Sequence, residues 1–350
     1  MTQASAPPQE PERIPAAAVG ADRAPVWSSL QRRLLGGSNA SILLILLAIV
    51  AVFAALDSSA FVTVTNVRNI AVDVSILLVM AVGATFVIIT SGIDLSIGAV
   101  LVFSGVVAVR AMEAVGGDGT GVALAGLAAA LASGIAWGVL NGLLVAKARL
   151  NPLIVTLGTL GMAFGLAQLI TTGIDLSPPE SVGEFGIGRI GGEVPYLVVI
   201  AAAVALLGGI VLAKTRFGRY TYAAGSNFEA ARRAGIAVDQ HLIKVYGIAG
   251  FLAGLGGFLA LARFSSTTIA GHSNDNLQVI AGVVIGGTSL FGGVGTIVGT
   301  TIGILIPGVL QNGFVVVGTQ PFWQEVAVGA VLIVAVYLDQ MRRRRRYNPR

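Results

Sequence analysis

Few residues in this chain of 350 could do catalytic chemistry. The chain has no cysteine, which excludes a disulfide framework, a thiolate metal site and a cysteine nucleophile. Its two histidines, His241 and His272, are too far apart for a zinc-binding HExxH motif. None of the three lysines follows a glycine, so the Gly-Lys step of a nucleotide-binding P-loop is missing. The sequence therefore predicts neither an enzyme nor an ATPase, and it predicts no cofactor.

The polar segment at 214–241 carries residues suited to binding another protein. Ser226 and Glu229 have the spacing of a capping box, in which the Ser226 hydroxyl accepts from the Glu229 N–H and the Glu229 carboxylate reaches back. The following alanines and arginines favour a helix, and Gly235 is a suitable terminator. The helix could lie among lipid headgroups, or it could dock a cytoplasmic partner. The candidate contact residues are Ser226, Asn227, Glu229, Ala230, Ala231, Arg232 and Gly235.

Asp94 lies in a break, flanked by glycine and serine, between two apolar stretches. A carboxylate at the bilayer centre costs on the order of 2.5–3.5 kcal/mol and is rarely kept there without a role. Asp94 could cap a helix start with Ser91 or Ser96, or the break could line or gate a pathway. Polar amides within apolar stretches could bind a hydroxylated solute or join helices. The candidate pathway or gate residues are Ser91, Gly92, Asp94, Ser96, Asn141, Gln278 and Asn312.

The elements that must position these residues are membrane spans. Hydrophobic residues make up 55% of the chain and charged residues 11%, against about 25% charged in a soluble domain. This composition excludes a soluble enzyme, a disordered chain and a nucleic-acid-binding domain. Since the apolar stretches are continuous rather than alternating, they predict an all-α polytopic membrane protein. About ten spans are expected, at 39–57, 70–90, 97–113, 121–146, 152–171, 195–213, 242–263, 277–291, 294–316 and 322–339.

The basic residues predict the orientation of these spans. With ten spans and a cytoplasmic N-terminus, eighteen of the 22 Lys and Arg residues fall on the cytoplasmic side. The net charge of +5 therefore indicates topology and contact with anionic lipid, not nucleic acid. Residues 1–36 are rich in proline and predict a disordered cytoplasmic tail. Residues 37–340 form the membrane domain, and 341–350 form a basic cytoplasmic tail.

Two minor sequence patterns also carry predictions. A near copy of the Asp94 break, at 172–177, follows the fifth span and should lie on the opposite side of the membrane. An inverted repeat would place it so, although chance is the simpler explanation for two six-residue strings. Two sets of spaced glycines predict close helix packing, and these are Gly158, Gly161 and Gly165, and Gly295, Gly299 and Gly303.

Four segments resemble the permeases of ABC importers. Glu229-Ala230-Ala231 followed by Gly235 resembles the EAA…G coupling loop of these permeases. Residues 81–98, which end in SGIDLSIG, residues 141–159, and the GGTSLFGGVG string at 286–295 resemble the sugar branch, typified by the ribose-type permease. The resemblance extends from about residue 40 to 339, and the proline-rich N-terminal tail departs from it.

This resemblance implies an ABC importer permease fold in the bacterial inner membrane. The permease would carry a monosaccharide, such as a ribose-like pentose, a hexose or a related polyol. It would pair with a second copy of itself, a cytoplasmic ATP-binding subunit that drives it through the 226–235 helix, and a periplasmic sugar-binding protein. A permease for branched-chain amino acids or nucleosides is the nearest alternative, although the spans hold no Arg or Lys at mid-depth for a solute carboxylate. An ion-coupled secondary transporter would need mid-depth titratable groups, for which Asp73, Asp94 and Glu325 are the candidates.

Overall fold

The computed structural model describes residues 38–272 and 274–320, together with seven separate helical positions between 323 and 337. These residues belong to one unit, Ser38–Arg350. The predicted tails at 1–36 and 341–350 lie outside the described residues, as does most of the predicted span at 322–339.

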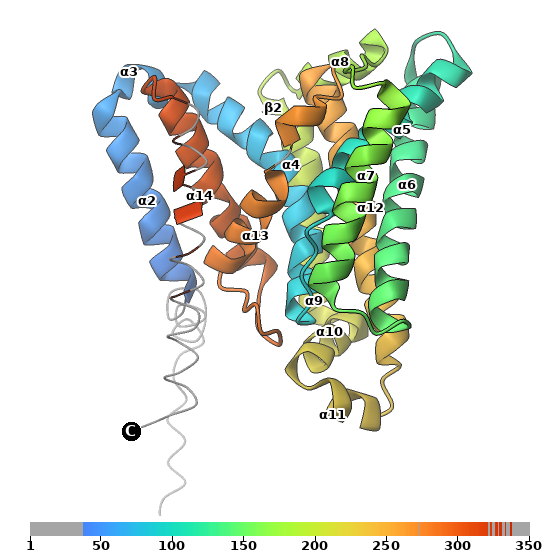
Figure 1. The fold of residues 1–350 in the computed structure, drawn as a ribbon. Coiled ribbons are helices and arrows are strands. Elements are labelled where there is room, and N and C mark those ends of the chain that lie inside the picture. The colour runs from blue at the N-terminus through green and yellow to red at the C-terminus, as the bar shows by residue number, and fades with distance from the viewer. Residues whose placement is uncertain are drawn as a thin grey trace, which may run out of the picture. The chain divides into compact units, whose positions relative to one another are not determined.

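The described part of the chain is built almost entirely of helices, as predicted (Figure 1). Continuous apolar sequence favours helices because backbone polar groups in hydrocarbon must bond within their own segment. Within the residues that the structure describes, seven helices are long and apolar enough to cross a membrane. They are α4 (Val64–Ile89), α5 (Ile97–Val115), α6 (Thr120–Ala146), α7 (Pro152–Thr171), α9 (Tyr196–Lys214), α12 (Val238–Phe264) and α14 (Ile297–Val316).

The predicted count of ten helical spans is not confirmed. The first predicted span corresponds to α2 (Ser38–Leu56), whose apolar part, Ile42–Leu56, is shorter than the seven spans. The eighth, at 277–291, is wrong as a continuous helix, because α13 (Asp275–Ile285) has only 11 residues. That length covers about 16 Å, roughly half of a hydrocarbon core. Gly286 and Gly287 follow α13, and Gly287 has a φ of +87°, which ends the helix.

Residues 286–296 continue from α13 without helical structure. The Gly293 N–H donates to the carbonyl of Ile89, the last residue of α4, at 2.8 Å. The segment formed by α13 and this loop therefore leads from the end of α12 to the end of α4. Hydropathy averaged over the predicted span at 277–291 could not detect that the helix ends at Ile285 and that a loop follows.

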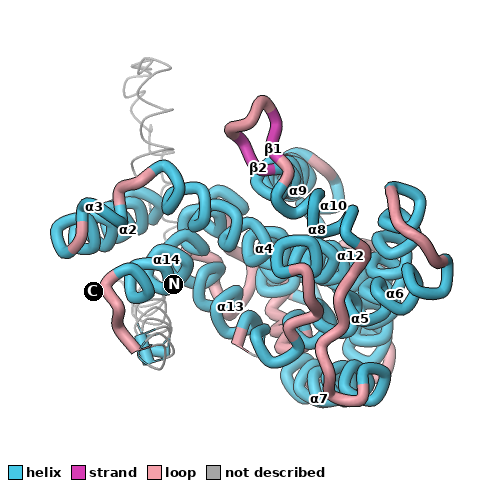
Figure 2. Tube along the Cα trace, turned by 90° about the horizontal axis from the view of Figure 1, so that it is seen from above, coloured by secondary structure: helices cyan, strands magenta, loops and turns pink. Residues whose placement is uncertain are grey.

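The helices divide into buried central ones and outer ones. Most of α4 and α12 is buried, whereas α7 and α9 expose most of their length. From above, α4 and α12 lie between α7 and α9 (Figure 2). Large apolar side chains such as Leu169 and Leu206 are exposed on the outer helices. This arrangement suits a lipid-facing shell around a protein-packed centre.

Glycines let the central helices approach closely. A Cβ at Gly134 of α6 would lie 2.3 Å from the Gly250 carbonyl oxygen of α12. A Cβ at Gly138 of α6 would lie 2.3 Å from the Tyr246 carbonyl oxygen of α12. The predicted packing at Gly299 and Gly303 is confirmed, since a Cβ at either would lie 2.0 or 2.1 Å from a neighbouring carbonyl oxygen.

The other predicted glycine set behaves differently. Gly158, Gly161 and Gly165 have nothing within 4 Å of a Cβ position, so the predicted close helix packing is not seen for them within the described residues of this chain. The spacing of small residues does not indicate which side of a helix faces protein.

Short elements lie at the two ends of the spans. Helix α3 (Ser58–Phe61), helix α8 (Glu180–Ile187), strands β1 (Arg189–Ile190) and β2 (Val194–Pro195), and the 3₁₀ helix η1 (Ile269–His272) connect spans at one end. At the other end, α10 (Arg216–Ser226) and α11 (Phe228–Arg233) connect α9 to α12 (Figure 1). These are called the α8 end and the α11 end below.

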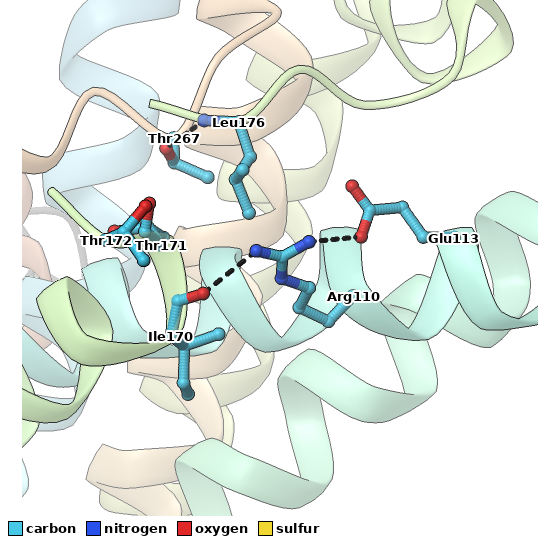
Figure 3. A network of polar contacts seen from close by, with 7 residues as sticks. All are labelled: Arg110, Glu113, Ile170, Thr171, Thr172, Leu176 and Thr267. Carbon is cyan, nitrogen blue, oxygen red and sulfur yellow. Dashed lines mark hydrogen bonds and ion pairs between the residues drawn. The ribbon is translucent and has the colours of Figure 1, made fainter. Parts of the chain in front are cut away.

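The near copy of the Asp94 break lies at the α8 end, opposite the end of α4, as predicted. There, Arg110 of α5 donates to Glu113 at 2.7 Å and to the Ile170 carbonyl of α7 at 2.9 Å (Figure 3). The Leu176 N–H donates to the Thr267 hydroxyl at 3.0 Å. These contacts join α5 to α7, and the connection before α8 to the connection after α12, and they differ from those around Asp94, so they give no support for a repeat.

Candidate functional site

Helix α11 begins one residue later than the capping-box prediction requires. Its N-cap is Asn227, whose side chain accepts from the Ala230 N–H at 2.9 Å. Helix α10 continues through Ser226, and the Ser226 hydroxyl donates back to the Tyr222 carbonyl at 2.8 Å. The capping box of Ser226 and Glu229 is therefore wrong, because Asn227 has the extended backbone that an N-cap needs.

The predicted stop of α11 at Gly235 is confirmed. Gly235 has a φ of +83°, and its N–H donates to the Arg232 carbonyl at 3.0 Å. The next N–H, of Ile236, donates to the Ala231 carbonyl at 3.1 Å, which completes a Schellman motif. Ile236 also packs in the same apolar cluster as Ala231, so the turn is fixed by both hydrogen bonds and packing.

One face of the α10–α11 pair packs against the spans, and the other is exposed. Ala231 is 5% exposed and packs with Ala224, Val238 and Leu242 against Ala146 at the end of α6. Ala231 thus supports the helix and does not offer a contact surface. The other six candidate contact residues are exposed, and α11 lies beyond the ends of the spans (Figure 1).

A junction beneath α11 joins three distant parts of the chain. The Ser91 hydroxyl, just after α4, donates to the Phe291 carbonyl at 2.9 Å and lies 3.2 Å from the Gly225 carbonyl oxygen of α10. The Tyr222 hydroxyl of α10 donates to the Gly295 carbonyl at 2.7 Å. Burial raises the pKa of Tyr222, so this hydroxyl keeps its proton. We call these contacts, with the bond from Gly293 to Ile89, the α4–α10 junction.

The junction is close-packed around Gly225. A Cβ at this position would lie 1.7 Å from the Ile89 carbonyl oxygen and 2.9 Å from the Gly293 nitrogen. Only glycine fits between these backbones. The two sequence strings that carry the resemblance, SGIDLSIG and GGTSLFGGVG, therefore meet directly at α10.

Asp94 fixes the turn that precedes α5. It is 5% exposed, and its Oδ1 accepts from the Ser96 N–H at 2.9 Å and the Ser96 hydroxyl at 2.6 Å. Asn141 of α6 donates to the Ser96 oxygen at 2.9 Å, and Asn276 of α13 donates to the Leu95 carbonyl at 3.1 Å. Asp94 therefore bonds to Ser96, one of its two predicted partners, but α5 has Ser96 as its N-cap and no side-chain cap hydrogen bond, so the predicted capping is not seen.

Ser91 and Gly92 lie outside this buried network. Ser91 is exposed and belongs to the junction, as described above. A Cβ at Gly92 would lie 2.6 Å from the Tyr246 hydroxyl oxygen of α12, so this glycine permits close packing.

The remaining candidates, Gln278 and Asn312, line a cleft of about 350 Å³ between α4, α13, α14 and the end of α12. Asn312 and Asn66 exchange two hydrogen bonds of 2.9 Å through their amides. Six of the seven pathway candidates therefore fall into three places, namely the junction, the Asp94 network and the cleft, and the seventh, Gly92, packs against Tyr246. Among the described residues, no group of three metal-ligating side chains forms a metal site.

Sequence reasoning missed two pairs in this cleft. Arg263 of α12 donates through Nε to Asp73 of α4 at 3.0 Å, and Nδ1 of His272 lies 2.7 Å from the Asp275 carboxylate. The sequence separation of 190 residues hides the first pair. The sequence offered one signal for this cleft. Asp275 and Gln278 are three residues apart, so these two polar side chains share one face of α13.

Comparisons with known proteins show the family of the chain. The family model described as branched-chain amino acid transport system / permease component matches residues 66–336. The ribose import permease of Escherichia coli K12 is 41% identical over 303 residues, covering 85% of this chain and 92% of that protein. No solved structure matches the chain.

Two further relatives are similar over nearly as much of their length. The ribose import permease of Bacillus subtilis 168 is 38% identical, covering 83% of this chain and 90% of that protein. The D-allose transport system permease of E. coli K12 is 36% identical, covering 85% and 90%. The chain therefore belongs to the family of branched-chain amino acid transport system permease components, in which its relatives are sugar permeases of ABC importers.

Proposed function

We propose that this chain is the permease subunit of an ABC importer for a monosaccharide, and that it forms the solute pathway across a bacterial inner membrane. The observation that carries the proposal is the similarity to ribose and allose permeases over at least 90% of their length. Although the family description names branched-chain amino acids, the three relatives cited above are named as ribose or allose permeases. This favours a sugar over the amino-acid alternative.

The exposed surface of α11 is the proposed docking site for a cytoplasmic ATP-binding subunit. Asn227, Glu229, Ala230 and Arg232 face outward, while Ala231 holds the helix against the spans. Movement of α11 would be transmitted through α10 to the α4–α10 junction. From there it reaches the end of α4 and the loop after α13, the two elements that lead toward the centre of the protein.

The remaining assignments complete the proposed importer. The α11 end faces the cytoplasm, and the acidic connection at 172–194 faces a periplasmic sugar-binding protein. Ten crossings result if α2, α13 with its following loop, and the segment at 322–339 are each counted as one. A second copy of the chain completes the pathway, and ATP is hydrolysed only by the partner, since the sequence lacks the Gly-Lys step of a P-loop.

Uptake into vesicles tests the proposal. The chain would be reconstituted with its ATP-binding subunit and its binding protein, and uptake of D-ribose, D-allose and L-leucine would be compared. We expect sugar uptake that requires internal ATP, ignores ion gradients and disappears when residues 226–235 are deleted, while membrane insertion persists. Uptake driven by an ion gradient without ATP would contradict the proposal, and uptake of L-leucine alone would exclude the sugar assignment.

A further inference from the structure

The cleft between α4, α13, α14 and the end of α12 has the chemistry of a small binding site. Its volume of about 350 Å³ is near the lower limit of ligand pockets, which suits one small solute. Asp73 lies about 14 Å into α4, at the depth of the spans. Charged and amide side chains at that depth are costly against lipid, so the cleft must open to water or to protein.

Each ionisable side chain in the cleft has a hydrogen-bonding partner. Arg263 is paired with Asp73 at 3.0 Å, and His272 is paired with Asp275 at 2.7 Å. No charged side chain among these four is left alone to select a carboxylate, an ammonium or a metal ion. The cleft therefore favours a neutral solute that carries its own hydrogen-bonding groups.

Two buried acceptors in the cleft lack partners among the described residues. They are Nε2 of His272, a residue only 6% exposed, and Oε1 of Gln278. Because the Asp275 carboxylate can only accept, Nδ1 of His272 carries the proton, and Nε2 offers a lone pair. Buried acceptors without partners are costly, and hydroxyl groups are donors that could satisfy both.

Apolar surface completes the cleft. Phe264, Ile70 and Leu77 line it beside the exposed amides of Asn69 and Gln311. A pocket with apolar walls and a few placed polar groups is typical of small-molecule sites. The C–H faces and hydroxyls of a sugar match these two kinds of surface.

We propose that this cleft is a weak binding station for one monosaccharide on its way through the permease. The inference rests on the proposed transport function and adds a solute site within the chain itself. The cleft lies toward the α8 end, about 24 Å along α4 from the α4–α10 junction. Asn276, two residues from Gln278, bonds to the Asp94 turn, so the start of α13 touches both the cleft and the buried network.

Thiol labelling tests the proposal in the assembled importer. Since the chain has no cysteine, Val315→Cys in the cleft and Val115→Cys at the end of α5 each supply a single thiol. The two valines are 62% and 60% exposed, so they form a matched pair. With D-ribose at about 10 mM and millimolar affinity, labelling of Val315→Cys by a water-soluble maleimide should slow by about tenfold. Labelling of Val115→Cys should not change.

Two substitutions in the cleft provide a second part of the labelling experiment. Gln278→Leu removes the buried acceptor, and Gln311→Ala trims an exposed amide with little risk to folding. Either change should reduce the protection by D-ribose. Unchanged labelling in an importer that still takes up D-ribose with ATP would overturn the binding station and leave the proposed function intact. Protection by L-leucine and not by D-ribose would also overturn it, whereas an importer that takes up no sugar would refute the proposed function.

Discussion

Replacing Gly225 with alanine should uncouple α11 from the spans. The new methyl group would lie 1.7 Å from the Ile89 carbonyl oxygen and 2.9 Å from the Gly293 nitrogen. An ordinary C···O contact is about 3.3–3.6 Å, so α10 must move away from α4 by more than about 1.5 Å. That shift would break the contact between Ser91 and Gly225 and strain the bond from Gly293 to Ile89.

The free-energy cost of Gly225→Ala is the sum of the lost hydrogen bonds and the overpacking. Two hydrogen bonds contribute about 1–3 kcal/mol together, and overpacking adds about 1–3 kcal/mol, which gives about 2–6 kcal/mol against the close-packed junction. Since 1.4 kcal/mol is about a factor of ten in a rate, sugar uptake should fall at least about tenfold. Binding of the ATP-binding subunit should persist, because the exposed face of α11 is unchanged.

The assay compares ATP-driven uptake with co-purification of the ATP-binding subunit. Gly158→Ala is the matched control, because a methyl group there meets nothing within 4 Å. Its uptake should equal that of the unmodified importer. The reasoning is refuted if Gly225→Ala transports normally, and it is also refuted if uptake is lost only because the ATP-binding subunit no longer binds.

Two further predictions concern stability and pH. Gly138→Ala should lower the free energy of unfolding by about 1–3 kcal/mol, because its methyl group would lie 2.3 Å from the Tyr246 carbonyl oxygen, and unchanged thermal stability would contradict this. At the α8 end, hydrogen bonds from the Ser181 hydroxyl and the Gly119 N–H lower the pKa of Asp118. The contact should therefore stabilise α8 above the ordinary carboxylate pKa and be lost as the pH falls through the lowered value. Hydrogen exchange of the α8 amides, corrected for intrinsic rates, should show this dependence, and Asp118→Asn should abolish it.

Much of the fold was accessible from the sequence because it depends on local properties. Continuous apolar stretches predict helices wherever the backbone must bond within itself, and Gly235 predicts the end of α11 from its backbone freedom alone. The start of α11 was harder, since Ser226 and Asn227 are both good caps. Which of them serves depends on how far α10 continues, and tertiary packing decides that.

The functional site was less accessible because it depends on contacts between distant residues. The α4–α10 junction brings Ser91, Gly225 and Phe291 together from three parts of the chain. The pair of Asp73 and Arg263 likewise joins α4 to α12. Composition and spacing indicated which residues were unusual, but only the arrangement of helices shows that they fall into a junction, a buried network and a cleft.

The most direct test of docking at α11 is cross-linking from two neighbouring positions. The chain has no cysteine, so Ala230→Cys and Ala231→Cys each introduce a single thiol. In the unmodified chain Ala230 is exposed, whereas Ala231 is only 5% exposed. With a short thiol-to-amine reagent in the assembled importer, Ala230→Cys should cross-link to the ATP-binding subunit and Ala231→Cys should not. Failure of Ala230→Cys to cross-link, or equal cross-linking from Val115→Cys at the α8 end, would contradict the docking of that subunit on α11.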